Sequence, residues 1–271
     1  MQIDPEIVGH YLEGHEHKRL AQGVGELERL RTEEILRRYL PDPPATLLDV
    51  GGAAGVYALH LAAQGYSVHL IDPIPLHIEQ AQAASAHQPD FPLASAALGD
   101  ARALSQADDS ADAILLLGPL YHLVDQADRQ RVLSEAFRVL KPGGVLFGAA
   151  ISRYASLLDG VAHGHLADPA FVAIVRADLT TGQHRNENNE PQYFTTAYFH
   201  RPEELQDELE TAGFAAVTVL GVEGPAWIGA SFASLWQNIA TRLDLLSLLE
   251  TIEQDPAILA TSAHLMGVAR K

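Results

Sequence analysis

Residues 46–72 read TLLDVGGAAGVYALHLAAQGYSVHLID, which has the pattern of a strand, a glycine turn, a helix and a second strand. Residues 46–50 form a short apolar run typical of a buried parallel strand, and Gly51, Gly52 and Gly55 follow it without bulky side chains. Apolar residues then recur at helical spacing up to residue 65, a glycine placed like a helix C-cap. The second strand leads into Asp72, 17 residues after Gly55. An acid at this distance suits a ribose held over the glycine turn, so the stretch predicts a nucleotide-type ligand.

The composition favours a protein that folds unaided and binds a small molecule. The chain has 271 residues, of which 47% are hydrophobic, and a formal net charge of -17, which disfavours nucleic acids and anionic membranes. The absence of cysteine excludes disulfides, thiolate nucleophiles and cysteine-bound metals. The N-terminus lacks a signal-peptide pattern, and no run approaches the roughly 20 apolar residues of a membrane span. We therefore expect a cytoplasmic monomer or homodimer with no nucleic-acid or membrane partner.

Strand and helix patterns alternate on both sides of the opening stretch. Residues 8–39 carry the apolar periodicity of one or two helices, which PDPP at residues 41–44 would end. Further helices are predicted over 75–86, 126–140 and 202–213, and further strands over 93–98, 111–117, 145–150 and 216–220. Such alternation requires right-handed crossovers, so it predicts a mostly parallel sheet covered by helices on both faces.

This alternation is interrupted between residue 152 and about residue 195, where short segments are rich in His, Asp and Asn. We interpret this part as an inserted cap. Beyond it we expect a long helix over 231–253, with one apolar side, and a final strand over 265–269; the apolar side comprises Phe232, Leu235, Trp236, Ile239 and Leu243. The predicted organisation is a single domain over 1–271, made of N-terminal helices (1–40), a ligand-binding core (41–151), the cap (152–200) and the rest of the sheet (201–271).

Several motifs in a fixed order carry a family resemblance. DVGGAAG at 49–55 is followed by Asp72, then by Gly99-Asp100, by the DAILLLG strand at 112–118 and by EAFRVLKPGG at 135–144, with AGF at 212–214 in support. In this order they resemble the class I S-adenosylmethionine (SAM)-dependent methyltransferases, and most closely the small-molecule branch similar to ubiquinone/menaquinone methyltransferases. The resemblance implies a Rossmann-like three-layer α/β sandwich with a mostly parallel seven-stranded sheet, whose antiparallel last strand would be 265–269. It also implies SAM as cofactor and S-adenosylhomocysteine as product.

The resemblance also implies cofactor contacts for individual residues. Asp49 would orient the loop or receive the amino group of SAM, while the turn residues Gly51, Gly52, Ala53 and Gly55 would let the backbone approach the methionine part. The family usually has glycine where Ala53 stands, and the added methyl would be a small intrusion if φ is negative there. The resemblance also implies that Asp72 binds both ribose hydroxyls. Adenine would contact Ile74, Asp100 and the backbone of Ala101, and the sulfonium would lie beside Gly118 and Leu120. Alternatives are that Asp49 caps the next helix and that Asp100 is a solvated turn residue.

Residues outside the core are also candidates for the site. In the N-terminal helices, Tyr11 and Arg31 could close over the cofactor, with Arg31 pairing the cofactor carboxylate; an ordinary ion pair is the alternative for Arg31. In or beside the cap, His163, His165, His184 and His200 are candidates for acceptor contacts, and Trp227 could line an apolar pocket. His163 and His165 have no third ligand at motif-like spacing, so we predict no metal site.

Tyr121 and His122 follow the fourth strand, whose end faces the transferred methyl group in the resembled family. Methyl transfer is an in-line displacement on a cation, and a base is needed only if the acceptor must lose a proton. His122 could take such a proton near neutral pH, with Tyr121 beside it, or it could simply pack in a loop.

The predicted function is transfer of a methyl group from SAM to O or N, less often C, of a small-molecule acceptor. The GPLY sequence at 118–121 differs from the Asn/Asp-Pro-Pro-Tyr signature of amino-methylating nucleic-acid enzymes. One alternative is a nicotinamide oxidoreductase, although the third and sixth positions of its G-x-G-x-x-G motif are here Ala53 and Val56. Another is a non-catalytic SAM-binding scaffold, because fold does not determine function.

Overall fold

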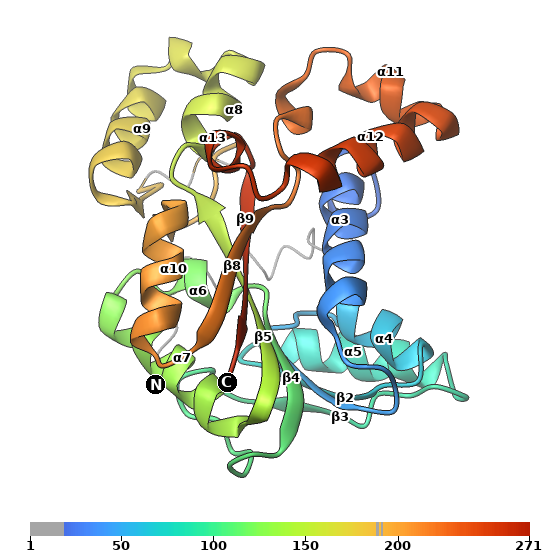
Figure 1. The fold of residues 1–271 in the computed structure, drawn as a ribbon. Coiled ribbons are helices and arrows are strands. Elements are labelled where there is room, and N and C mark those ends of the chain that lie inside the picture. The colour runs from blue at the N-terminus through green and yellow to red at the C-terminus, as the bar shows by residue number, and fades with distance from the viewer. Residues whose placement is uncertain (1–18, 188–189, 191) are drawn as a thin grey trace.

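The central sheet of the computed structural model, which describes residues 19–187, 190 and 192–271, is mostly parallel (Figure 1). Its parallel strands lie in the order β3 (Ser95–Leu98), β2 (Ser67–Asp72), β1 (Thr46–Val50), β4 (Ala111–Leu116) and β5 (Leu140–Ser152). The last strand, β9 (His264–Arg270), pairs antiparallel with both β5 and β8 (Ala215–Gly221). The predicted parallel sheet with an antiparallel final strand is therefore confirmed.

In the described residues the sheet has nine strands, two more than the resemblance implied. The additional strands, β6 (Gln183–His184) and β7 (Ala197–His200), come from the segment interpreted as a cap. β5 is 13 residues long, so its last residues extend beyond the pairing with β4 and pair in parallel with β7, with Ile151 opposite Phe199. A local sequence pattern cannot show this pairing, because β6 and β7 are too short to produce a periodic signal.

Helices cover both faces of the sheet. On one face, α7 (Gln126–Val139) and α10 (Pro202–Thr211) pack apolar side chains against the strands. On the other face, α3 (Gly23–Tyr39), α4 (Val56–Ala63) and α5 (Pro75–Ala86) do the same. Ile114 and Leu115 of β4, on opposite faces, are both fully buried, as expected for a central parallel strand.

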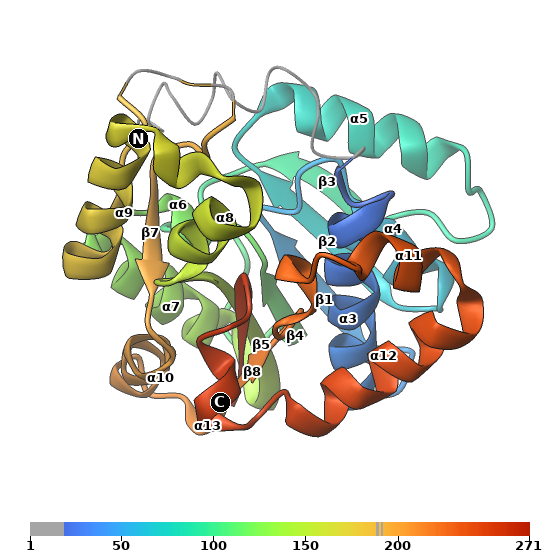
Figure 2. The same cartoon turned by 90° about the horizontal axis from the view of Figure 1, so that it is seen from above.

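The cap segment lies at the carboxyl end of β5. It contains α8 (Ala155–His163), a short 3-10 helix (His165–Ala167) and α9 (Pro169–Thr181), and α8 and α9 lie side by side in both views (Figures 1 and 2). The short helix α6 (Pro119–His122) follows β4 at the same edge of the sheet. This edge is where open parallel sheets bind ligands, so the fold places the cap over the expected binding side.

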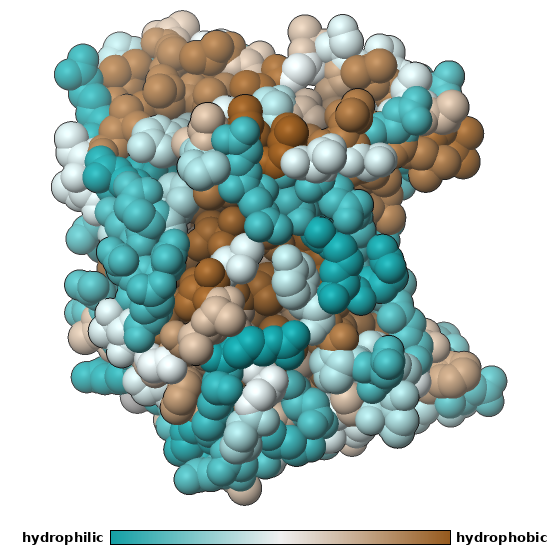
Figure 3. Space-filling model, viewed as in Figure 1, coloured by the Kyte–Doolittle hydropathy of each residue, from teal (hydrophilic) through white to brown (hydrophobic). Residues whose placement is uncertain are grey.

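The prediction of one helix over 231–253 is wrong, because Asn238 breaks it into α11 (Phe232–Gln237) and α12 (Ile239–Ile252). Asn238 has extended backbone angles, and its side chain accepts a hydrogen bond from the Ala240 amide at 2.9 Å, which caps α12. The break turns Phe232 towards α3, while Ile239 points to solvent and is 70% exposed. The surface over α11 and α12 accordingly includes brown patches among white and teal residues in Figure 3.

The elements that complete the C-terminal part are a 3-10 turn (Ala226–Ile228) and α13 (Pro256–Leu259). Within the described part of the chain, every helix is too short or too polar to cross a membrane.

Candidate functional site

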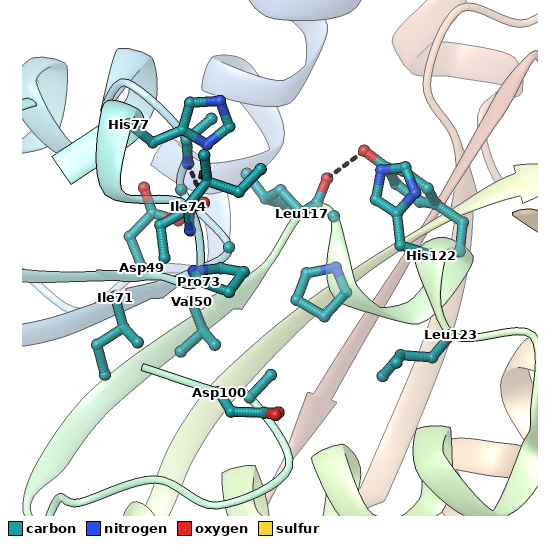
Figure 4. A pocket seen from close by; sticks show the side chains of 18 of the residues that line it. Asp49, Val50, Ile71, Pro73, Ile74, His77, Asp100, Leu117, His122 and Leu123 are labelled. Atoms are coloured by element: carbon teal, nitrogen blue, oxygen red, sulfur yellow. Dashed lines mark hydrogen bonds and ion pairs between the residues drawn. The ribbon is translucent and has the colours of Figure 1, made fainter. Parts of the chain in front are cut away.

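A cavity of about 350 Å³ lies at the carboxyl ends of β1, β2, β3 and β4. Figure 4 shows Asp49, Ile74 and His77 on one side of it, His122 and Leu123 on the other, and Asp100 at a third side. Its size falls in the usual range of small-molecule pockets. The turns that follow four strands therefore meet here, because parallel strands bring their carboxyl ends to one edge.

The glycine turn after β1 is shaped by its neighbours. Gly51 has φ +73°, and a Cβ there would lie 2.8 Å from Cδ of Pro119. A Cβ on Gly52 would lie 2.5 Å from Oδ2 of Asp49. Both residues line the cavity, whereas Gly55, with φ +87°, turns the chain into α4 and packs near Leu70. Glycine is thus required in this turn by close protein packing as well as by access of a ligand.

Ala53 lines the cavity in a left-handed conformation, with φ +48°. The condition under which the added methyl would be a small intrusion, a negative φ, is therefore not met. Its amide donates a hydrogen bond to Oδ2 of Asp72 at 2.9 Å, which fixes the turn in this conformation. A residue with a Cβ incurs a cost of roughly 1 kcal/mol in the left-handed region.

Asp72 connects the glycine turn to the start of α5. Besides the Ala53 amide on Oδ2, its Oδ1 accepts from the Ile74 amide at 2.9 Å and lies 2.9 Å from Nδ1 of His77. A carboxylate has about four acceptor directions, so these contacts leave one, on Oδ2, for a ligand hydroxyl. Asp72 and Ile74 both line the cavity, yet the structure leaves room for a hydrogen bond from one ribose hydroxyl where the resemblance implied two. His77 also lines the cavity and was not predicted. Its only sequence signal is its position in the first helical turn after Asp72.

Asp49 is a buried acid without a hydrogen-bond partner. Its side chain is 1% exposed, and neither carboxylate oxygen has a hydrogen bond of good geometry to the described residues, although the Ala58 amide lies near enough to lower the pKa against the effect of burial. Burial, and secondly the negative charge of Asp72, raise the pKa of Asp49 to about 7. The N-cap of α4 is Gly55, which has no side chain, and the amide of Ala58 in the first turn of α4 lowers the pKa of Asp49, which agrees with the alternative role of Asp49 at this helix start. A cationic group in the cavity, such as the amino group of SAM, fits this unpartnered carboxylate.

Asp100 is held at the cavity by Arg102. Nε and Nη2 of Arg102 donate to its two oxygens at 2.9 and 2.8 Å, and these hydrogen bonds lower the pKa of Asp100 despite partial burial. Nη1 of Arg102 donates a hydrogen bond to Oδ2 of Asp128 at 2.7 Å. Asp100 and Ala101 both line the cavity. Asp100 is therefore a fixed, ionised acceptor, which differs from a freely solvated turn residue.

The turn after β4 forms the wall opposite Asp49. Gly118, Tyr121 and His122 line the cavity, and the Tyr121 hydroxyl donates to the Leu117 carbonyl at 2.9 Å (Figure 4). The ring of His122 lies 4.6 Å from that of Tyr121. The prediction for Leu120 is wrong, since this residue is fully buried in the core under Gly148. Its neighbours Leu117 and Pro119 line the cavity instead.

Two predicted site residues belong to buried ion pairs. Arg31 is 0% exposed, pairs with Glu34 and Glu253, and donates to the Val222 carbonyl at 3.2 Å. The predicted contact between Arg31 and the cofactor is therefore wrong. His200 is also 0% exposed, with Nε2 3.4 Å from Glu208, so its predicted acceptor contact is wrong as well. Tyr11 lies outside the described residues.

A second cavity, of about 210 Å³, shares Arg19 and Tyr121 with the first. The predicted residue Trp227 lines it, and its Nε1 donates to the Thr261 carbonyl at 2.9 Å. Most of the other lining residues are aromatic or aliphatic: Ile151, Ala155, Phe171, Tyr193, Phe194, Phe199 and Ala263. The cap aromatics were missed in the sequence analysis, because single aromatic residues in an irregular segment carry no periodic signal.

The cap histidines lie in different surroundings. Nδ1 of His163 is 2.9 Å from Asp159, and His165 lies near the same acid, which itself lines the second cavity. His184 is 1% exposed and 3.0 Å from the buried Asp178. The cap therefore contributes aromatic rings and Asp159 to the cavity wall, while His184 supports the cap from inside.

Comparisons with known proteins agree with this geometry. A family model described as a methyltransferase domain matches residues 47–144. The ubiquinone/menaquinone biosynthesis C-methyltransferase UbiE of Acidiphilium cryptum is 30% identical over 201 residues, which cover 73% of this chain and 77% of that protein. An uncharacterized methyltransferase of Mycobacterium tuberculosis is 35% identical over 126 residues, 45% of this chain and 48% of the relative. The chain thus spans about half the length of this mycobacterial relative.

A solved SAM-dependent methyltransferase from Methanosarcina mazei superposes with a TM-score of 0.58 at 21% identity, covering 88% of this chain and 96% of that one. At this identity the likeness shows the shared fold. The ordered motifs and the 30% identity to a UbiE protein show the family. The alternative of a nicotinamide oxidoreductase therefore has no support. The chain therefore belongs to the class I SAM-dependent methyltransferases, and SAM is its cofactor.

Proposed function

We propose that the protein transfers the methyl group of SAM to an oxygen or nitrogen atom of a small-molecule acceptor bound in the second cavity. The observation that carries this proposal is the contact between the two cavities, which share Tyr121 and Arg19. A cofactor in the first cavity and an acceptor in the second would meet beside the turn that follows β4. The net charge of -17 supports a small acceptor over a nucleic acid.

The walls of the second cavity favour a flat, largely apolar acceptor. Aromatic rings such as Phe171, Phe194 and Phe199 offer faces and edges for stacking, and a 210 Å³ space suits a small ring system. His264 contributes a protonated imidazole. Burial would lower its pKa, but the carboxylates of Glu28 and Glu223 outweigh burial and raise the pKa of His264 to about 9. Because this imidazolium is already paired with the two carboxylates, it adds a polar group and no net positive charge to the cavity wall.

The chain's own residues supply alignment and proton removal. In-line transfer forms the bond from the acceptor atom to the methyl carbon while the carbon–sulfur bond breaks and its electron pair stays on sulfur. In our proposal Asp49 holds the amino group of the cofactor and Asp72 its ribose, both on the β1–β2 side of the cavity, while His122 lies on the opposite wall (Figure 4). In our proposal His122 takes the proton that an acceptor hydroxyl or amine loses, with Tyr121 packing against its ring.

A labelled-methyl screen tests the proposal. Purified protein with methyl-labelled SAM is incubated with a panel of phenols and aromatic amines, and products are detected by retained label and mass. We expect at least one acceptor to be methylated, and Trp227→Ala to raise its KM while the SAM affinity stays unchanged. The matched control is His87→Ala, on the surface at the end of α5. SAM binding without any labelled product, also from metabolite extracts, would instead favour the non-catalytic alternative.

A further inference from the structure

Asp159, His163 and His165 form a cluster of metal-ligand type in the cap. Nδ1 of His163 lies 2.9 Å from Oδ1 of Asp159, and Nε2 of His165 lies 3.8 Å from Oδ2 of the same carboxylate. One ligand atom from each residue falls within 4.8 Å of those from the other two. Side-chain ligands bound to one zinc ion lie somewhat closer together than this, so modest side-chain rotations would bring all three atoms onto a common ion.

The local backbone explains why these residues meet. Asp159 and His163 are four residues apart on α8, so they lie on one face of the helix. Gly164 follows in the left-handed conformation, with φ +78°, and ends the helix. This turn brings His165 back over the same face, where its ring is 5.9 Å from that of His163. The sequence pattern does not indicate the third ligand, because Asp159 stands before the histidine pair, at helical spacing.

The chemistry of the three groups suits a transition metal. Two imidazoles and one carboxylate are ligands that zinc and related divalent ions accept, whereas magnesium and calcium prefer oxygen ligands. Among the described residues, the ion-pair partners of Asp159 are the two histidines, so no arginine or lysine neutralises it there. We propose that Asp159, His163 and His165 bind one divalent transition-metal ion of the zinc class.

The position of the cluster connects it to the acceptor cavity. Asp159 lines the second cavity, and the ring of His165 contacts two other lining residues, Phe171 at 5.4 Å and Tyr193 at 5.7 Å. Three protein ligands leave one tetrahedral position open. This assignment rests on the proposed function: the open position would be filled by water or by an oxygen atom of the acceptor. That oxygen would lie at the end of the acceptor opposite the atom that receives the methyl group.

A second cluster, formed by Glu28, Glu223 and His264, differs in its chemistry. Nδ1 of His264 is 2.6 Å from Oε1 of the buried Glu223, whose Oε2 accepts a hydrogen bond from the Ser262 hydroxyl. This histidine is already engaged in an ion pair, and a metal would have to displace its proton. The cap cluster, in contrast, is partly exposed and open to an ion from solvent.

Cobalt(II) binding provides the test. The full chain, freed of any affinity tag, is titrated with Co²⁺ in the absence of SAM and acceptor, and visible absorption and calorimetry follow the binding. We expect one saturable ion per chain with the intense bands of a tetrahedral site, and competition by Zn²⁺. Asp159→Asn and the double variant His163→Ala/His165→Ala should each weaken binding at least about tenfold, since even loss of groups beyond the ligands has effects of that size. The control His87→Ala removes a surface histidine elsewhere and should bind as the wild type does.

The inference is overturned if no saturable Co²⁺ site is found, or if the cap variants bind as tightly as the wild type. Circular dichroism of each variant shows whether it is folded, and Asp159→Asn keeps the shape of the side chain if the double variant is unstable. Because the titration contains neither SAM nor acceptor, its failure would leave the proposed methyl transfer intact. Conversely, a failed methylation screen would leave the metal site intact.

Discussion

Replacing Asp49 with asparagine should stabilise the ligand-free protein at neutral pH while weakening its binding of SAM. The carboxylate is 1% exposed and lacks a hydrogen-bond partner among the described residues, so its charge opposes folding. The amide of asparagine has nearly the same shape and stays neutral at every pH. The two effects have opposite signs, because a group that is unfavourable in the empty cavity becomes favourable next to a cationic ligand.

The size of the stability effect follows from the pKa. Burial, and then the charge of Asp72, raise the pKa of Asp49 from 3.8 to about 7 in the folded protein. The unfolded chain therefore releases this proton at lower pH than the folded protein does. The cost of ionisation is absent below about pH 4, grows as the pH rises towards 7, and is then constant at about 4 kcal/mol. The stability difference between Asp49→Asn and the wild type should change by this amount across that range, in favour of the variant at high pH.

Urea unfolding followed by tryptophan fluorescence, at several pH values between about 4 and 8, measures this difference. Asp112→Asn serves as a control of opposite sign: burial would raise the pKa of Asp112, but hydrogen bonds from Lys141 and the Thr46 amide lower it overall. That variant should lose stability at neutral pH. A stability difference for Asp49→Asn that stays constant with pH, or that shrinks as the pH rises, would refute the account of an isolated buried carboxylate.

Calorimetry measures the effect of the same Asp49→Asn substitution on the affinity for the cofactor. SAM should bind Asp49→Asn about 2 kcal/mol more weakly than it binds the wild type, the usual contribution of a hydrogen bond to a charged group. S-adenosylhomocysteine keeps the amino group of SAM but lacks the sulfonium charge. An equal loss for both ligands would identify the amino group as the partner of Asp49, and a loss for SAM alone would identify the sulfonium.

Four further substitutions test other parts of the site. Asp72→Ala should weaken SAM binding by about 2 kcal/mol in calorimetry and also lower the melting temperature, because the Ala53 and Ile74 amides lose their acceptor; unchanged affinity would place the ribose acid elsewhere. Ala53→Gly should stabilise the protein by about 1 kcal/mol in urea unfolding, since glycine relieves the φ of +48°, and should leave SAM affinity unaltered. Arg31→Met should cost about 2 kcal/mol of stability, because buried Glu253 loses one charged donor while Arg38 still donates to both its oxygens, and the folded fraction should bind SAM normally; a selective loss of SAM affinity would restore its predicted cofactor role. His122→Ala should lower kcat by about 10²–10⁴-fold with near-normal SAM affinity, and an unaffected kcat would exclude it as the base.

Local sequence patterns predicted the elements that hold the cofactor. The helix over 75–86 and the strand over 46–50 have the bounds that were predicted, because a proline at the first turn and an apolar run between turns act within a few residues. The positions of Asp49, Asp72 and Asp100 at one cavity also follow from sequence, since each stands at or just beyond the end of a predicted parallel strand.

Long-range packing decided the rest. Arg31 is a plausible cofactor ligand in the sequence, but its partner Glu253 lies more than two hundred residues away, and only the fold brings the two together. In the turn after β4, Leu120 packs into the core, whereas Leu117 and Pro119 line the cavity. This difference depends on the close packing of Pro119 against Gly51. The sequence by itself therefore determined the parallel core of the sheet with its antiparallel last strand, the family and the cofactor, because these depend on periodicity and ordered local motifs. Only the tertiary structure decided which of the other candidate side chains face the cavities, since that choice is made by contacts between segments distant in the chain.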